Sequence, residues 1–114
     1  MANTLYLLTT TNEVDSDSAV LDEKLQETTA SYTERNKGTI TVASSASYTA
    51  LPFGGVSSAT YIRISSTTAF SLKINGGTEI IASVKDFICA GTFTAASVAQ
   101  VSGAAVDIDY AFYG

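Results

Sequence analysis

Residues 59–81 constrain the fold most, because apolar and polar side chains alternate twice along this stretch. Ile62 and Ile64 alternate with Tyr, Arg and Ser, and a second alternating run extends from Phe70 to Ile74. Neighbouring residues of a β-strand face opposite sides of the sheet, so both runs predict strands with one buried face. A polar Ser-Ser-Thr-Thr segment lies between the runs, and we expect it to interrupt the strand.

An Asn-Gly-Gly sequence at residues 75–77 predicts a tight turn directly after this pair of strands. Asn and Gly tolerate the positive φ angles that such a turn requires. A further strand is expected from Ile80. The cleanest alternation lies at the end of the chain, where apolar residues from Val106 to Phe112 alternate with Asp107 and Asp109. This pattern predicts a final strand with an acidic outer face.

Shorter strand-like runs occupy residues 4–11, 39–43 and 48–51, and the last of these is followed by Pro-Phe-Gly-Gly. About seven to nine short strands at a spacing of about 8–12 residues are typical of an all-β domain. We therefore predict a single β-sandwich or jelly-roll-like barrel of antiparallel strands with an extended N-terminal arm. The interpretation of residues 18–28 stays open between a short helix and an extended segment.

Gly38 marks the predicted boundary within this single domain. Residues 1–38 form the N-terminal strand and an acidic connector, and residues 39–114 form the core of the sandwich. The first part carries seven acidic and three basic residues, whereas the second carries four and three. Only 15% of all residues are charged, below a typical share of about 25%, and Ser and Thr are abundant. A hydroxyl-rich surface of this kind suits an extracellular or assembled protein.

The N-terminal strand is unusual in being apolar on both faces. Tyr6 and Leu8 are expected on one face, and Leu5 and Leu7 on the other. A terminal strand of this kind is a good candidate for pairing with the sheet edge of a neighbouring subunit. Tyrosines are common interface anchors because an apolar ring ends in a polar hydroxyl. The predicted interface residues are therefore Leu5, Tyr6, Leu7, Leu8, Tyr32 and Phe53.

The sequence offers few groups for catalysis. It contains no histidine and a single cysteine, Cys89, which sits among apolar residues and is expected to be a small buried hydrophobe. Zinc sites and most sites of nucleophilic catalysis need histidine or several cysteines, so we predict a non-enzymatic protein without a cofactor. A hydrolase using Asp107 and Asp109 is an alternative, although carboxylates on one strand face are more often simply solvated.

The charged residues bear on three further kinds of ligand: a divalent ion, nucleic acid and an anionic membrane. Glu13, Asp15 and Asp17 form either a solvated acidic loop or a site for a divalent ion at a subunit contact. The net charge of −5, without a basic patch, argues against nucleic acid and against an anionic membrane as partners. No signal peptide is recognised at the N-terminus, and no apolar run reaches the length of a membrane helix.

Two stretches resemble small virion structural proteins of tailed bacteriophages. The first is the opening MANTLYLLTTTNEVDSDSAVLDEKLQETTASYTE, in which a short hydrophobic strand precedes a polar, Thr-rich leader. The second is FSLKINGGTEII together with the terminal VDIDYAFYG. Their layout is similar to that of small phage head and tail proteins, in which a strand with Lys-Ile-Asn-Gly is followed by a final strand ending in an aromatic residue and glycine.

The resemblance implies a capsid decoration, or cement, protein that binds the major capsid protein or another virion protein. Such proteins often form trimers of jelly-roll-like domains, with an N-terminal arm clamped on neighbouring capsid subunits. The implied location is the capsid surface of a virion, after synthesis in the host cytoplasm. The alternative is a receptor- or carbohydrate-binding module, or an adaptor, of a phage tail or fibre.

Overall fold

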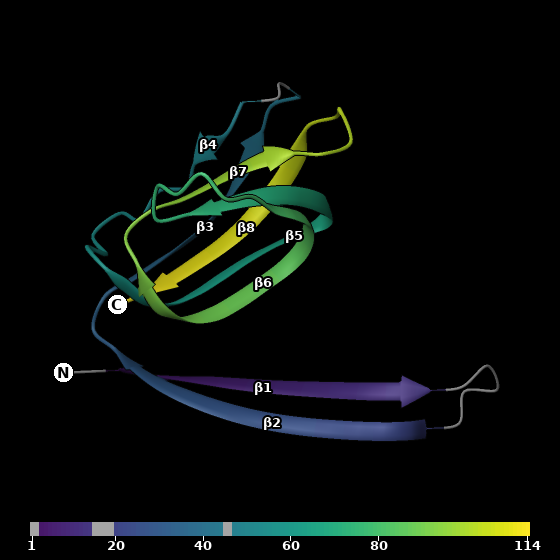
Figure 1. Ribbon diagram of the computed structural model, residues 1–114. Helices are drawn as coiled ribbons and strands as arrows, with labels where there is room; N and C mark the ends of the chain where they lie inside the picture. The colour runs from purple at the N-terminus through teal and green to yellow at the C-terminus, as the bar shows by residue number, and fades with distance from the viewer. Residues whose placement is uncertain (1–2, 15–19, 45–46) are drawn as a thin grey trace. The chain divides into compact units, whose positions relative to one another are not determined.

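A computed structural model describes residues 3–14, 20–44 and 47–114 (Figure 1). Every regular element in these ranges is a β-strand, and every strand pairing is antiparallel. The predicted all-β antiparallel class is therefore confirmed. The chain divides into two compact units, Met1–Thr33 and Glu34–Gly114, and each unit has a sheet of its own. The division falls a few residues before Gly38, which lies inside a strand.

The first unit is a long β-hairpin. Strand β1 (Asn3–Val14) pairs with β2 (Val20–Tyr32) in a continuous register from Asn3 opposite Tyr32 to Glu13 opposite Asp22. The predicted strand at residues 4–11 is confirmed and is longer than expected. Residues 20–28 of the segment with two open interpretations are extended and belong to β2.

The second unit is one curled sheet, a half-barrel, built from six strands. The strand order is β3-β8-β5-β7-β4, and β6 also pairs with β5. Whether this unit belongs to the sandwich or jelly-roll type stays a prediction. The six strands are β3 (Arg35–Val42), β4 (Thr49–Ala50), β5 (Ala59–Ile74), β6 (Ile81–Phe93), β7 (Ala96–Gln100) and β8 (Val106–Tyr113).

Strand β5 organises the half-barrel, because it pairs with three other strands. Residues 61–65 pair with β8, residues 70–74 pair with β7, and β6 pairs with both parts. The expected interruption by Ser-Ser-Thr-Thr is wrong, since β5 is continuous from Ala59 to Ile74. The polar segment instead coincides with a shift of the β5–β6 register between Ser65 and Phe70. It lies where β5 changes partner, and a bulge there allows the sheet to curl without ending the strand.

The predicted turn after β5 is confirmed. Asn75 and Gly76 have φ angles of 55° and 68°, and Gly77 N donates a hydrogen bond of 3.0 Å to Ile74 O. The Asn75 side chain also holds the β6–β7 connection. Its Nδ2 donates to Thr92 O at 2.9 Å, and its Oδ1 accepts from Thr94 N at 2.8 Å. One residue therefore shapes its own turn and fixes a second one.

The core fills the inner face of the half-barrel. Ile62 and Ile64 are fully buried as predicted, and Phe70 and Leu72 extend the same face along β5. Cys89 on β6 is half-buried and packs against this cluster, in partial agreement with the expected buried position. The largest fully buried side chains come from four of the six strands, β3, β5, β7 and β8: Val42, Ile62, Ile64, Phe70, Leu72, Val98, Ile108 and Phe112.

Candidate binding groove on the outer face

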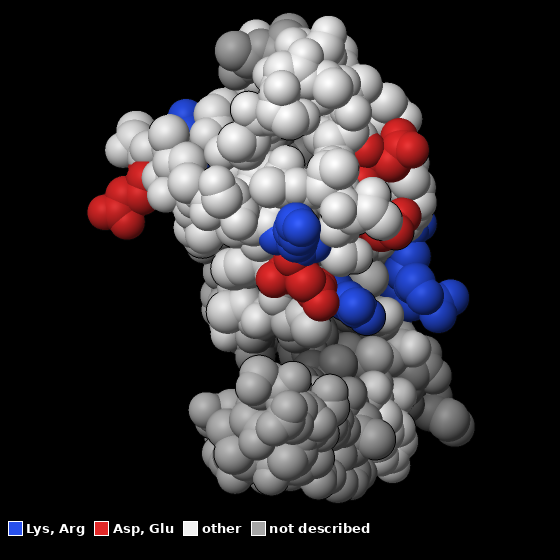
Figure 2. Space-filling view, turned by 90° about the vertical axis from the view of Figure 1, so that its right-hand side faces the viewer, with Lys and Arg blue, Asp and Glu red and all other residues white. Residues whose placement is uncertain are grey.

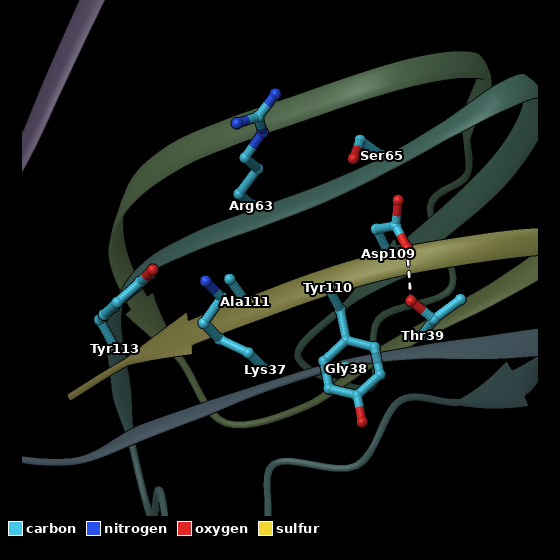
Figure 3. A pocket seen from close by; sticks show the side chains of 9 residues that line it. All are labelled: Lys37, Gly38, Thr39, Arg63, Ser65, Asp109, Tyr110, Ala111 and Tyr113. Carbon is cyan, nitrogen blue, oxygen red and sulfur yellow. Dashed lines mark hydrogen bonds between the residues drawn. The ribbon is translucent and has the colours of Figure 1, made fainter.

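The strand register brings two cationic side chains to the outer face of the half-barrel. Lys37 on β3 lies directly opposite Ala111 on β8, and Ala111 lies directly opposite Arg63 on β5. Residues opposite each other in an antiparallel pair share a face of the sheet. Lys37 and Arg63 therefore flank the small Ala111 from both sides (Figure 3).

A groove of about 520 Å³ lies over these residues. Its floor is low because the methyl group of Ala111 is the only side chain between the two longer cationic ones. Tyr113 borders one end, and Ser65 with Asp109 borders the other (Figure 3). The groove is lined by nine residues of β3, β5 and β8: Lys37, Gly38, Thr39, Arg63, Ser65, Asp109, Tyr110, Ala111 and Tyr113.

The two cations differ in their partners. Arg63 Nε lies 3.4 Å from Asp86 Oδ1, and both side chains are about half exposed. Exposed ion pairs of this kind contribute little, about 0–1 kcal/mol. Lys37 is exposed and forms no ion pair within the described part of the chain. Figure 2 shows acidic and basic residues close together on a surface that is otherwise mostly uncharged.

Asp107 and Asp109, the predicted acidic pair, lie on the outer face of β8. Asp109 Oδ1 accepts a hydrogen bond of 2.5 Å from the Thr39 hydroxyl, and Asp107 Oδ1 accepts one of 2.7 Å from Thr41. Both bonds join β8 to the register partners of these residues on β3. The two carboxylates therefore tie the strands together, and a hydrolytic role for them stays an untested alternative.

Tyr61 and Tyr113 pair edge to face beyond the groove, with ring centroids 6.3 Å apart. Tyr61 is buried, and its hydroxyl has no hydrogen-bond partner among the residues that the structure describes. Burial raises the pKa of Tyr61 above the ordinary value because the charged tyrosinate is poorly solvated there, although the nearby Arg63 opposes the shift.

The predicted interface residues are spread over both units. On the hairpin, Tyr6 is 70% exposed, whereas Leu5 and Tyr32 are half-buried. Phe53 instead packs on the core of the half-barrel. Leu7, Leu8 and Glu13 lie in β1, but their side chains are outside the described part, as are Asp15 and Asp17.

The cationic groove was not anticipated from the sequence. Lys37 and Arg63 are far apart along the chain, and neither belongs to a recognisable motif. The alternation around Arg63 did indicate that its side chain faces outward. Their meeting across Ala111 depends on the pairing of β3 and β5 with the same strand, β8, which a sequence pattern does not specify.

Among the described residues, no cluster of histidine, cysteine or acidic side chains is arranged to hold a metal ion. Over the same ranges, no helix is long and apolar enough to span a membrane. No family model, curated protein or solved structure matches this chain.

Proposed function

We propose that this chain is a non-enzymatic structural protein of a virion, which decorates an assembled capsid and stabilises it. The β1–β2 hairpin serves as the arm that contacts neighbouring capsid subunits, and the half-barrel forms the outer body. One observation supports the proposal above all. The hairpin has strands of 12 and 13 residues, yet within the described ranges no third strand pairs with it.

A two-stranded ribbon of this length favours a partner for two physical reasons. An isolated hairpin is only marginally stable in water, because it has little apolar surface to bury. Each outer edge also presents backbone N–H and C=O groups that another strand could pair with. Tyr6, 70% exposed on β1, adds an aromatic anchor beside such an edge. Binding along capsid subunits would supply both the missing pairing and the missing burial.

The half-barrel is suited to remain folded outside the capsid. Its cluster of buried residues runs from Val42 to Phe112. Glu34 and Gly114 close the unit by donating backbone hydrogen bonds to each other, both of 2.9 Å. A protein that binds only the assembled shell stabilises that shell by mass action. The trimeric state and the jelly-roll type belong to this proposal as well.

The proposal is tested by binding to capsids purified from the virus whose genome encodes the chain. We compare the full chain with a variant lacking residues 1–33, after circular dichroism has verified that the half-barrel is folded. Full-length protein should co-sediment saturably with capsids, and the truncated variant should not. Ile80→Ser, which changes an exposed side chain of the half-barrel, is the matched control and should bind normally. Equal binding by truncated and full-length protein would reject the arm.

The same purified protein and capsids distinguish the capsid proposal from the alternative of a receptor- or carbohydrate-binding tail module. In that case, the protein should bind host cells or a glycan array and should leave capsids unoccupied. The capsid proposal predicts the opposite pattern in both assays.

A further inference from the structure

The net charge of the chain resides entirely in the hairpin unit. Residues 1–33 contain six acidic residues and one lysine, whereas residues 34–114 contain five acidic and five basic residues. The two units are thus a strongly acidic one and a neutral one, which together give the net charge of −5. An acidic segment of this kind is attracted to any surface where cations are concentrated.

The neutral unit concentrates cations on one part of its outer face. Arg35 and Lys37 on β3 and Arg63 on β5 occupy adjacent rows of the register, with Lys37 and Arg63 in the same row as Ala111. Two strand spacings separate the backbones of Lys37 and Arg63 by about 10 Å. A carboxylate placed over Ala111 would be within reach of both cationic side chains (Figure 3).

The carboxylates already near the groove leave Lys37 and Arg63 able to bind a further carboxylate. Asp109 is held by the Thr39 hydroxyl, and Asp86 is bound by Arg63 through Nε and Nη2. A guanidinium group carries five N–H donors in a planar fork, so the contact with Asp86 leaves the Nη1 donors of Arg63 for a second carboxylate. The ammonium group of Lys37 forms no ion pair within the described ranges.

We propose that this groove binds the acidic hairpin of a second copy of the chain. The contact joins two different surfaces and is therefore head to tail, so successive copies close into a ring or extend as a filament. The inference goes beyond the capsid-binding function, because it concerns contacts between copies and is tested on the purified protein alone. Failure of capsid binding would leave it unaffected, and its own failure would leave capsid binding untouched.

The test measures self-association of the full-length chain by sedimentation equilibrium at low and high salt. Wild-type protein should associate, and association should weaken with salt because the charges are exposed. The double variant Lys37→Glu/Arg63→Glu should raise the dissociation constant at least about tenfold, as loss of close charge pairs at an interface does. Lys73→Glu/Lys85→Glu makes the same change in net charge away from the groove and should associate like the wild type.

Complementary charge reversal identifies the hairpin as the occupant. Glu23→Lys/Glu27→Lys in the hairpin should weaken self-association, and mixing this variant with Lys37→Glu/Arg63→Glu should restore binding between the two. Circular dichroism verifies that each variant is folded. A wild-type protein that stays monomeric at millimolar concentration would overturn the proposal. So would unchanged association of the groove variant, absence of rescue in the mixture, or hairpin-to-groove cross-links formed only within one chain.

Discussion

Phe53 stacks on Phe112, with the ring centroids 4.2 Å apart and the ring planes inclined by 17°. Phe112 is fully buried on the inner face of β8, whereas Phe53 comes from the Pro-Phe-Gly-Gly loop between β4 and β5. Tyr110 also stacks on Phe112, with the ring centroids 5.4 Å apart. This aromatic group joins a loop to the final strand, so the loop belongs to the core that holds the groove strands in place.

Replacing Phe53 with alanine should therefore destabilise the half-barrel. Its ring is half-buried, so we expect a loss of about 1–3 kcal/mol, below the full cost of a buried phenylalanine. Urea unfolding followed by tyrosine fluorescence measures the change. Ile80→Ala, at a side chain that is 56% exposed, should change stability by less than about 0.5 kcal/mol. Equal effects of the two substitutions would contradict the role of the stack.

Gly38 on β3 makes room for the ring of Tyr110. A Cβ atom at this position would lie 2.6 Å from the Tyr110 hydroxyl oxygen and 2.9 Å from its Cζ. Gly38→Ala should displace the ring and reduce stability by about 1 kcal/mol or more, as overpacking does. Gly55→Ala is the matched control, because a Cβ there meets no atom within 4 Å. Thermal unfolding of both variants checks this, and a larger effect at Gly55 would be inconsistent with it.

Asn75 contributes both a positive φ angle and side-chain hydrogen bonds to Thr92 and Thr94, and two substitutions separate these roles. Asn75→Gly keeps the turn accessible but loses the bonds to Thr92 and Thr94, so we expect a loss of about 1–2 kcal/mol. Asn75→Ala loses the same bonds and adds strain at φ 55°, so it should be less stable still. Urea unfolding ranks the wild type and the two variants by their free energy of unfolding. If the glycine variant matches the wild type, the side-chain bonds do not support the β6–β7 connection.

Tyr61 should make the half-barrel sensitive to alkaline pH. Because burial raises its pKa in the folded protein, the unfolded chain loses this proton first, near the ordinary value of about 10. The contribution of the Tyr61 proton to the free energy of unfolding is therefore fully present below about pH 10, and it is lost as the pH rises through the higher pKa of the folded protein. Tyr61→Phe should remove the part of the alkaline loss of stability that ionisation of Tyr61 causes. It should leave stability at pH 7 unchanged or slightly higher, since the lost hydroxyl has no partner among the described residues.

The measurement is urea unfolding of the wild type and Tyr61→Phe at several pH values from 7 to about 11. An identical pH dependence of the two proteins would contradict the assignment to Tyr61. A clear loss of stability in the variant at pH 7 would instead indicate that the hydroxyl is hydrogen-bonded.

Local patterns predicted much of the half-barrel. Strand β8 coincides with the alternating run from Val106 to Tyr113, because period-two patterning directly reports a sheet with one buried face. The turn at Asn75 and Gly76 followed from the tolerance of these residues for positive φ. Both features are set by residues adjacent in the sequence.

Features that depend on distant pairing could not be predicted in this way. The Ser-Ser-Thr-Thr segment has the composition of a loop, yet it stays in β5 because β6 pairs with the residues before and after it. Residues 20–28 have a weak helical pattern, but pairing with β1 makes them extended. The groove needs β3, β8 and β5 side by side, so Lys37 and Arg63 carry no local sign of their proximity.

The central claim, that the chain is a structural component of a virion, is tested most directly by quantitative mass spectrometry of purified virions. The virions come from the virus whose genome encodes the chain, and the copy number is calibrated against the major capsid protein. We predict that the chain is present in a fixed ratio to that protein. Absence of the chain from purified virions would contradict the claim.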